Sequence, residues 1–336
     1  GISDRTDAVT GESYYSQNND IDDFVGAAYV NFDKRLGNFY LSAGIRYEYT
    51  VSDAYADGTD FNTDYHGFFP SFTFNWSKKH WDISLNYARR ISRPSFNMLN
   101  PNLIYSDSLY YRCGNPLLKP TFSNDIEFSL YWNGFDFTAG YTHYEDYVAS
   151  IMESDPVNSA VTRYTYTNFD NYQEWLFGLG YHGQWNWYTG SYEVYLNVPY
   201  GKIDYMGKPL LRNRPSVKVS LHNTFDVSDN VSLYCDFYYS SGKEEDITIF
   251  KPSYDLSAGM VWYLLDNKLA ISLDVYDILY MSNTSCYQMR YGNTTVNVDN
   301  REDTRYVRLG IRYSFNNIKA NIRIRQSNNE EIGRVM

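Results

Sequence analysis

The sequence lacks several features that would assign it to common protein classes. It has no run of about 18 or more apolar residues, so no membrane-spanning helix is predicted. Lys and Arg number 29 against 40 Asp and Glu, and this acidic balance argues against a protein that binds nucleic acid through a basic face. A glycine-rich phosphate loop and a dinucleotide fingerprint are also missing, and we predict no cofactor.

Cysteine is scarce, and its spacing is uninformative about metals. The three cysteines are Cys113, Cys235 and Cys286, an odd number without a Cys-x-x-Cys pair, which predicts neither a disulfide framework nor a zinc site. A bridge between Cys113 and Cys286 stays open as an alternative. The chain begins at Gly1 in a polar segment without a signal peptide, and we expect a processed or truncated piece of a longer protein.

Tyrosine is abundant, with 36 residues, and aromatic residues make up 18% of the chain, a composition that favours an all-β protein. Apolar and polar residues alternate with a period of two in about thirteen segments, which predicts strands of an antiparallel up-and-down sheet. The predicted strands are 24–32, 39–50, 68–76, 81–90, 125–132, 135–141, 175–181, 192–198, 217–225, 231–238, 256–262, 269–275 and 306–315.

Three regularities of these strands point to a barrel in a membrane. The alternation extends over roughly 9 to 12 residues, which a tilted strand needs to cross a bilayer. Odd-numbered strands end in short turns and even-numbered ones in connections of roughly ten to thirty residues, and six of the seven Trp lie near the short turns. We therefore predict that 1–315 is a transmembrane β-barrel segment and that 316–336 is a flexible periplasmic tail. The alternative is a soluble or surface-exposed glycan-binding or adhesin module, whose strands also alternate.

The polar face of the predicted strands carries charges that would face the lumen. They either line a substrate path, contact another domain, or simply hydrate the wall. These residues are Arg46, Glu48, Asp82, Arg90, Asp125, Glu127, Arg308 and Arg312.

The stretch 89–120 interrupts the alternation. Its X-Pro steps favour extended and turn backbone, so we expect a long loop that is pinned at both ends and forms a fixed corner of the barrel rim. Its aromatic residues either stack on a ligand ring or pack the loop against the rim. They are Phe96, Tyr105, Tyr110 and Tyr111.

Weaker patterns in the sequence concern metal binding and catalysis. His143 and Glu145 share a strand face, but two ligands do not make a metal site, and we predict none. The acidic groups at 20–23 and 57–60 are expected to be solvated rather than to bind Ca²⁺. Ser220 and His222 stand about 7 Å apart on one face, too far for a nucleophile and its base, and we predict that the chain is not an enzyme.

The long loop carries a resemblance to a known family. The motif comprises Arg93-Pro94, Asn100-Pro101, Gly114-Asn115-Pro116, Leu118 and Pro120, followed by an acidic alternating strand. It resembles the barrels of TonB-dependent receptors, most of all the outer-membrane β-barrel family of Bacteroidetes.

The resemblance implies a fragment of a barrel of about 22 strands with a plug inside it. About nine strands and the plug would lie upstream of Gly1, and this chain alone would not transport. It also implies contact with outer-membrane lipid, with TonB through the plug, and with a surface lipoprotein as a further candidate partner. The expected function is import of a bulky nutrient such as a glycan, a siderophore or a peptide across the bacterial outer membrane.

Overall fold

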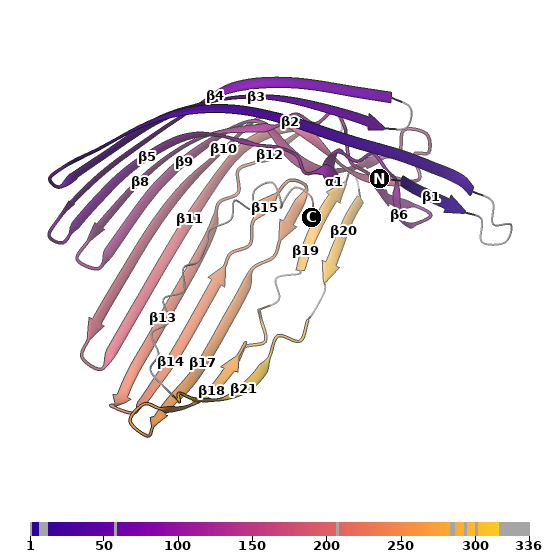
Figure 1. Ribbon diagram of the computed structural model, residues 1–336. Helices are drawn as coiled ribbons and strands as arrows, with labels where there is room; N and C mark the ends of the chain where they lie inside the picture. The colour runs from indigo at the N-terminus through magenta and orange to yellow at the C-terminus, as the bar shows by residue number, and fades with distance from the viewer. Residues whose placement is uncertain are drawn as a thin grey trace.

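The computed structural model describes residues 2–6, 13–56, 59–205, 208–282, 286–291, 294–299 and 302–315. Thirteen long strands run up and down in it, and each is antiparallel to the next (Figure 1). They are β2 (Ser13–Leu36), β3 (Phe39–Ala56), β4 (Thr59–Lys78), β5 (Trp81–Ser92), β8 (Thr121–Trp132), β9 (Phe135–Ser154), β10 (Thr162–Trp185), β11 (Tyr188–Tyr205), β13 (Ser216–Ser228), β14 (Val231–Ser240), β17 (Ser253–Leu264), β18 (Leu269–Tyr276) and β21 (Tyr306–Tyr313). The predicted all-β, up-and-down fold is confirmed, and each predicted strand coincides with one of these.

The sheet curves into an open trough (Figure 1). Among the described residues, β21 forms a ladder only with β18, and residues 19–36 of β2 pair only with β3. β1 (Ile2–Thr6) pairs with the first part of β2. The trough therefore has two open edges, at β2 and at β21.

Short turns join the strands at one end of the trough. Leu36 pairs with Phe39 and Trp132 with Phe135, so only two residues lie between them. At the second of these turns, Asn133 and Gly134 both have positive φ, at 47° and 93°, as the twist of a two-residue hairpin requires. β2 and β8 are the first and fifth of the thirteen predicted strands, so both turns follow odd-numbered members of that series, as predicted.

Aromatic rings gather next to the short turns. The rings of Trp81 and Trp132 stack with centroids 5.2 Å apart, and Trp185 stacks on Tyr188 at 5.5 Å. All these rings except Tyr188 are exposed, together with many aliphatic side chains of the same sheet face. Such a broad apolar face suits lipid and not water, because soluble monomers rarely expose large apolar patches.

The opposite end carries the longer connections and several small elements. The long loop contains α1 (Phe96–Leu99), β6 (Ile104–Asp107) and β7 (Tyr110–Arg112), and β12 (Lys208–Arg212) pairs with β11. Four further strands from two other loops form a second sheet: β15 (Glu244–Glu245), β16 (Thr248–Phe250), β19 (Cys286–Tyr291) and β20 (Thr294–Asp299).

One expected connection is wrong. The predicted strands 39–50 and 68–76 leave the polar segment 52–66 as a connection, but residues 51–56 of β3 pair with 59–64 of β4 and prolong the hairpin. Ladder hydrogen bonds do not require an apolar face, so a polar segment can pair where both faces meet water. Most other strands also exceed the predicted length, and β10 reaches 24 residues. The exception is β21, which ends at Tyr313, two residues before its predicted end.

No helix of the described ranges has the length and apolar character needed to span a bilayer. The predicted tail, 316–336, lies outside the described residues.

Candidate functional site in the trough

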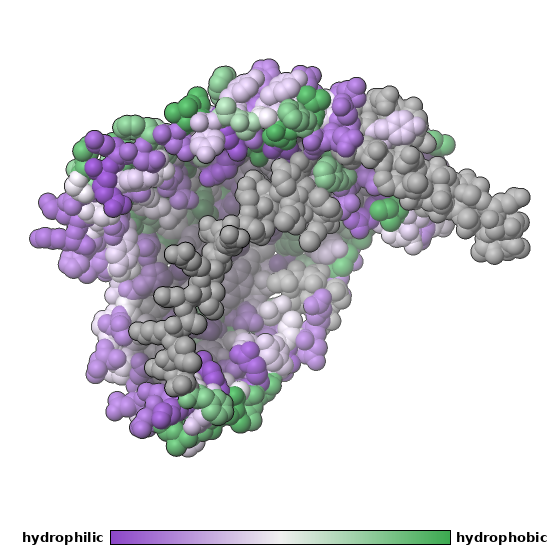
Figure 2. Space-filling model, viewed as in Figure 1, coloured by the Kyte–Doolittle hydropathy of each residue, from purple (hydrophilic) through white to green (hydrophobic). Residues whose placement is uncertain are grey.

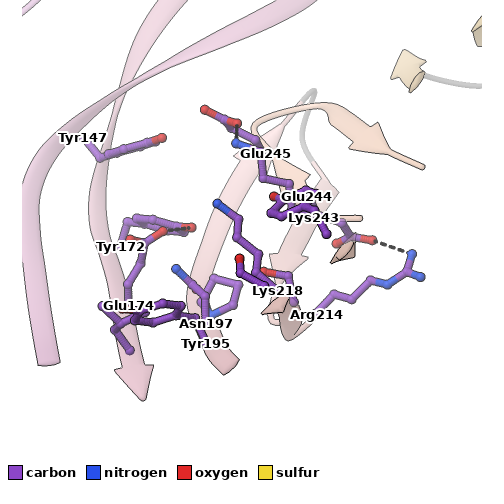
Figure 3. A pocket seen from close by; sticks show the side chains of 15 residues that line it. Tyr147, Tyr172, Glu174, Tyr195, Asn197, Arg214, Lys218, Lys243, Glu244 and Glu245 are labelled. Carbon is purple, nitrogen blue, oxygen red and sulfur yellow. Dashed lines mark hydrogen bonds and ion pairs between the residues drawn. The ribbon is translucent and has the colours of Figure 1, made fainter. Parts of the chain in front are cut away.

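The polar face of the sheet bounds a cavity of about 610 Å³ at the loop end of the trough. Figure 3 shows Tyr172 and Glu174 of β10, Tyr195 of β11 and Lys218 of β13 around it, and β15 contributes Glu244 and Glu245 from above. Because β15 covers the polar face, this face is the inner wall of the trough. Figure 2 shows the hollow with hydrophilic side chains along its inner surface.

Two tyrosine rings of this wall lie against glycines of the neighbouring strand. Tyr195 is directly opposite Gly178, and a Cβ built on that glycine would meet the ring at 2.7 Å. Tyr172 covers Gly201 in the same way, at 2.6 Å. Glycine is needed at these two positions because a side chain would push the ring away. The wall thereby presents aromatic surface to the cavity.

A break in the alternation of β9 adds a third and a fourth ring. Asp146 has a positive φ of 51°, so Tyr144 and Tyr147, three residues apart, both reach Tyr172. The ring centroids of Tyr144 and Tyr147 lie 5.7 Å and 4.7 Å from that of Tyr172. Tyr147 and Tyr172 line the cavity, and Tyr144 packs against Tyr172 beside them. Periodicity alone does not predict this cluster.

Most charges around the cavity are paired. Glu174 accepts a hydrogen bond of 2.9 Å from the Tyr172 hydroxyl, Lys243 pairs with Glu245, and Arg214 lies 4.0 Å from Glu244. Lys218 is exposed and forms no ion pair with any residue that the structure describes. The Lys218 ammonium and the Glu174 carboxylate thus offer a ligand one positive and one negative charge in a cavity that is also lined by tyrosine rings.

A second cavity, of about 320 Å³, continues the wall toward β5 and β8. It shares Glu174 and Asn197 with the first cavity, so the two form one groove. Arg90 and Asp125, which form an ion pair of 2.6 Å, line it together with Glu127. These three predicted lumen residues therefore lie in the groove.

The other predicted lumen residues lie elsewhere. Arg46 is 3.5 Å from the buried Glu48, and Arg308 forms an ion pair of 3.0 Å with Asp274. Asp82 and Arg312 are exposed near the short-turn end, where their strands begin and end. Sequence periodicity places residues on a face, but it does not tell which of them share a cavity.

The long loop is anchored on the wall by its motif residues. Arg93, whose side chain is 10% exposed, reaches Glu48 at 3.4 Å and the hydroxyls of Thr50 and Tyr65 at 3.0 Å. This arginine therefore ties the start of the loop to β3 and β4. Pro94 beside it is buried, as are Leu118 and Pro120 at the end of the loop.

The glycine and asparagine of the motif close the loop on itself. Gly114 N–H donates to the Asn100 carbonyl at 2.7 Å, and a Cβ at Gly114 would lie 2.5 Å from the backbone oxygens of Asn100 and Met98. Asn115 donates its side-chain amide to the Tyr166 carbonyl at 3.0 Å. Pro101 and Pro116 complete the motif and are both partly buried.

A strand inside the loop completes the attachment. β7 pairs in parallel with β10, Tyr110 opposite Thr162, beyond the point where β10 leaves β11. Tyr111 is only 3% exposed and its hydroxyl donates to Asp155 at 2.5 Å. This bond holds the pKa of Asp155 below its usual range, and burial raises the pKa of Tyr111.

The four aromatic residues proposed as ligand contacts thus differ in access. The ring of Tyr111 packs inside the loop, and Tyr105, at 42% exposure, lies 5.1 Å from it. Phe96 and Tyr110 are partly buried. In this structure Tyr105 is the most exposed of the four rings, and none of the four lines the cavities described above.

Metal and catalytic constellations find no support among the described residues. No group of three or more His, Cys, Asp or Glu side chains there is arranged to hold a metal ion. His222 contacts Asp236, and its other ring nitrogen lies 3.4 Å from Thr224, so it is not directed at Ser220. All three cysteines are described and none of them forms a disulfide, so Cys113 and Cys286 are not bridged. Asp57, and the side chains of Asp20 and Asp60, lie outside the described residues.

Comparisons with solved structures find the same fold. The copper transporter OprC superposes with a TM-score of 0.62 at 13% identity, covering 93% of this chain and 52% of that one. The ferric-catecholate import receptor Fiu from E. coli K12 gives 0.58 at 15% identity, with 89% and 45% covered. The FrpB iron transporter from Neisseria meningitidis gives 0.56 at 16%, with 89% and 46% covered.

The chain thus spans about half the length of the structures that it matches. A comparison with curated proteins finds none that matches. The outer membrane protein beta-barrel family matches residues 4–313, nearly the whole chain. The curved antiparallel sheet, its lipid-suited outer face and this match together show that the chain belongs to the outer membrane protein beta-barrel family and is a barrel segment of the bacterial outer membrane.

Proposed function

We propose that the chain is the barrel part of a TonB-dependent receptor that imports a bulky nutrient. The observation that carries the proposal is the tyrosine-walled groove inside the trough, at the end where the long loops gather. Its two cavities measure about 610 and 320 Å³, in the range of small-molecule sites. The shared fold with import receptors supports this function.

The groove is suited to binding and not to a reaction. Ring faces stack on sugar or aromatic rings, and the charges of Lys218 and Glu174 orient polar groups of the ligand. Glycan, siderophore and peptide all fit this chemistry. Selectivity would come from these side chains and from exposed loop residues such as Tyr105.

The proposed partners follow from the open trough. Within the described part of the chain, the edges of β2 and β21 have backbone groups without a ladder partner, which favours pairing with further strands until the barrel closes. An N-terminal plug would fill the lumen and couple TonB to the bound nutrient. A surface lipoprotein above the loops is a further proposed partner.

Substitution of two wall tyrosines tests the proposal. Full-length receptor, with and without Tyr172→Ala and Tyr195→Ala together, is expressed in cells with intact or deleted TonB. Growth is measured on ferric siderophores, oligosaccharides and peptides supplied one at a time. We expect growth on one class that requires both TonB and the two rings.

The matched control is Tyr131→Ala, an exposed tyrosine of β8 near the short turns that lines neither cavity. It should leave growth unchanged. Growth that is independent of TonB would refute the proposal that the protein is a TonB-dependent receptor. Growth that needs TonB but tolerates loss of both rings would refute only the groove as the binding site.

A further inference from the structure

The cavity has a roof that is not part of the barrel wall. We name β15, β16, β19 and β20 the lid. β16 pairs with β19, Thr248 opposite Met289, and Lys251 N–H donates to the Cys286 carbonyl at 3.0 Å. Two loops that leave different strands of the barrel are thereby joined in one small sheet over the cavity.

The lid docks on the wall chiefly through one turn. Asp246, between β15 and β16, accepts two hydrogen bonds of 2.8 Å from Ser150 of β9, one from its backbone N–H and one from its hydroxyl. The neighbouring Ile247 is buried, and Glu244 pairs with Arg212 at 3.4 Å. These contacts hold the lid closed over the cavity.

The docked carboxylate of Asp246 has an unfavourable environment. Its Oδ1 is buried without a hydrogen-bond partner among the described residues, and the donors to Oδ2 are both neutral. The titratable groups that act on it are Tyr147 of β9, Tyr164 of β10 and Glu245 of its own hairpin.

The cations nearby pair with other carboxylates. Arg212 and Arg214 pair with Glu244, and Lys243 pairs with Glu245. No described Lys or Arg forms an ion pair with Asp246. A buried charge without a counter-ion weakens the contact that buries it, and a proton on that carboxyl removes the penalty.

We propose that the lid is a proton-controlled gate, which docks when Asp246 is protonated and is released when Asp246 ionises. The inference goes beyond the proposed function, because it concerns access to the cavity and holds for any ligand.

The sign of the pH dependence follows from burial. Burial raises the pKa of Asp246 in the docked lid, so docking takes up a proton. Docking is therefore strongest below the ordinary aspartate pKa and is progressively lost as the pH rises from there through the raised pKa. The docking equilibrium changes by about tenfold for each unit by which the pKa is raised.

Thiol labelling of the covered wall measures the gate. The full-length protein in detergent micelles carries Ala at the three native cysteines and one reporter, Ser216→Cys, at a partly buried position that lines the cavity under the lid. A bulky maleimide reagent is applied from about pH 4 to about pH 8, spanning the range above an ordinary carboxyl pKa. Val157→Cys, at 96% exposure in the loop after β9, corrects for the pH dependence of the reagent.

Three backgrounds separate the outcomes. With native Asp246, the labelling rate of the covered reporter relative to the exposed one should rise with pH, by about tenfold per unit of raised pKa. Asp246→Asn keeps an acceptor for Ser150 but does not titrate, so labelling should stay slow at every pH. Asp246→Ala lacks the acceptor, so labelling should be fast at every pH.

A pH profile in Asp246→Asn equal to that of the native background would overturn the proposal. So would a covered reporter that labels as fast as the exposed one throughout. Circular dichroism checks the strands of each variant. Should Asp246→Ala fail to fold, Ser150→Ala replaces it, since it removes one of the two donors and should speed labelling at low pH.

Discussion

At the residue scale, backbone contact explains why the long loop uses glycine where it does. Gly114 packs against the backbone oxygens of Met98 and Asn100, and its neighbour Asn115 reaches β10. Neither contact is visible in the sequence, where Gly-Asn-Pro indicates only a turn. The motif thus fixes the loop through close packing as well as through proline.

Gly114→Ala should destabilise the protein by about 1–3 kcal/mol, because the added Cβ meets backbone that cannot move aside alone. Thermal unfolding in detergent micelles measures the effect. The control is Gly26→Ala in β2, where the nearest atom to a new Cβ is 3.7 Å away and belongs to a side chain. Equal midpoints for the two variants would contradict the close packing.

The bond between Tyr111 and Asp155 should make the loop sensitive to acid. Because the folded protein lowers the pKa of Asp155, the bond contributes above about pH 4 and is lost as the pH falls through the lowered pKa. Tyr111→Phe should lower the thermal midpoint at neutral pH, and the gap to wild type should close in acid. Tyr110→Phe serves as the control. A gap that does not change with pH would exclude this bond as its source.

At the element scale, the strands extend beyond the bilayer and carry the loops. A strand needs about 9–11 residues to cross, and β9 and β10 have 20 and 24. The part of β10 beyond the bilayer pairs with β7. The corresponding part of β9 contains Ser150, on which the lid docks. The wall and its covering elements are therefore parts of the same strands.

Arg93 joins the loop to β3 and should show strong coupling with Glu48. Arg93→Met alone leaves a buried carboxylate with one cation fewer and should cost about 3–5 kcal/mol. Arg93→Met with Glu48→Gln should cost less than the sum of the two single changes. A double-mutant cycle from denaturant unfolding in micelles measures the coupling. Additive effects would show that the pair does not anchor the loop.

At the scale of the whole molecule, the two faces of the sheet meet different solvents. The outer face exposes many large apolar side chains, while the inner face carries the ion pairs and the groove. An open, two-edged sheet with such a face is unsuited to water.

The isolated chain should aggregate without detergent and recover strand structure when detergent or lipid is added. Circular dichroism and size-exclusion chromatography with and without detergent measure this outcome. A soluble monomer that unfolds cooperatively without detergent would contradict the membrane assignment and favour a soluble glycan-binding module. A water-soluble all-β protein of similar size is the control.

Much of the fold was predictable because it rests on local pattern. Alternation predicts thirteen strands and their order, since consecutive strands joined by short turns pair with each other. It did not predict the prolonged hairpin of β3 and β4, where no apolar face marks the strand. The small sheet of β15, β16, β19 and β20 was equally hidden, because it joins two loops distant in the chain.

The sequence alone determined the fold class, the alternation of turns and loops, the lipid-facing side and the family, because period, turn residues and motif are local properties of the chain. Only the tertiary structure decided which polar residues share a groove, that Tyr111 is buried, and that Asp246 docks a lid on Ser150. These depend on contacts between residues up to 96 positions apart, which register and loop folding create and a local pattern does not specify.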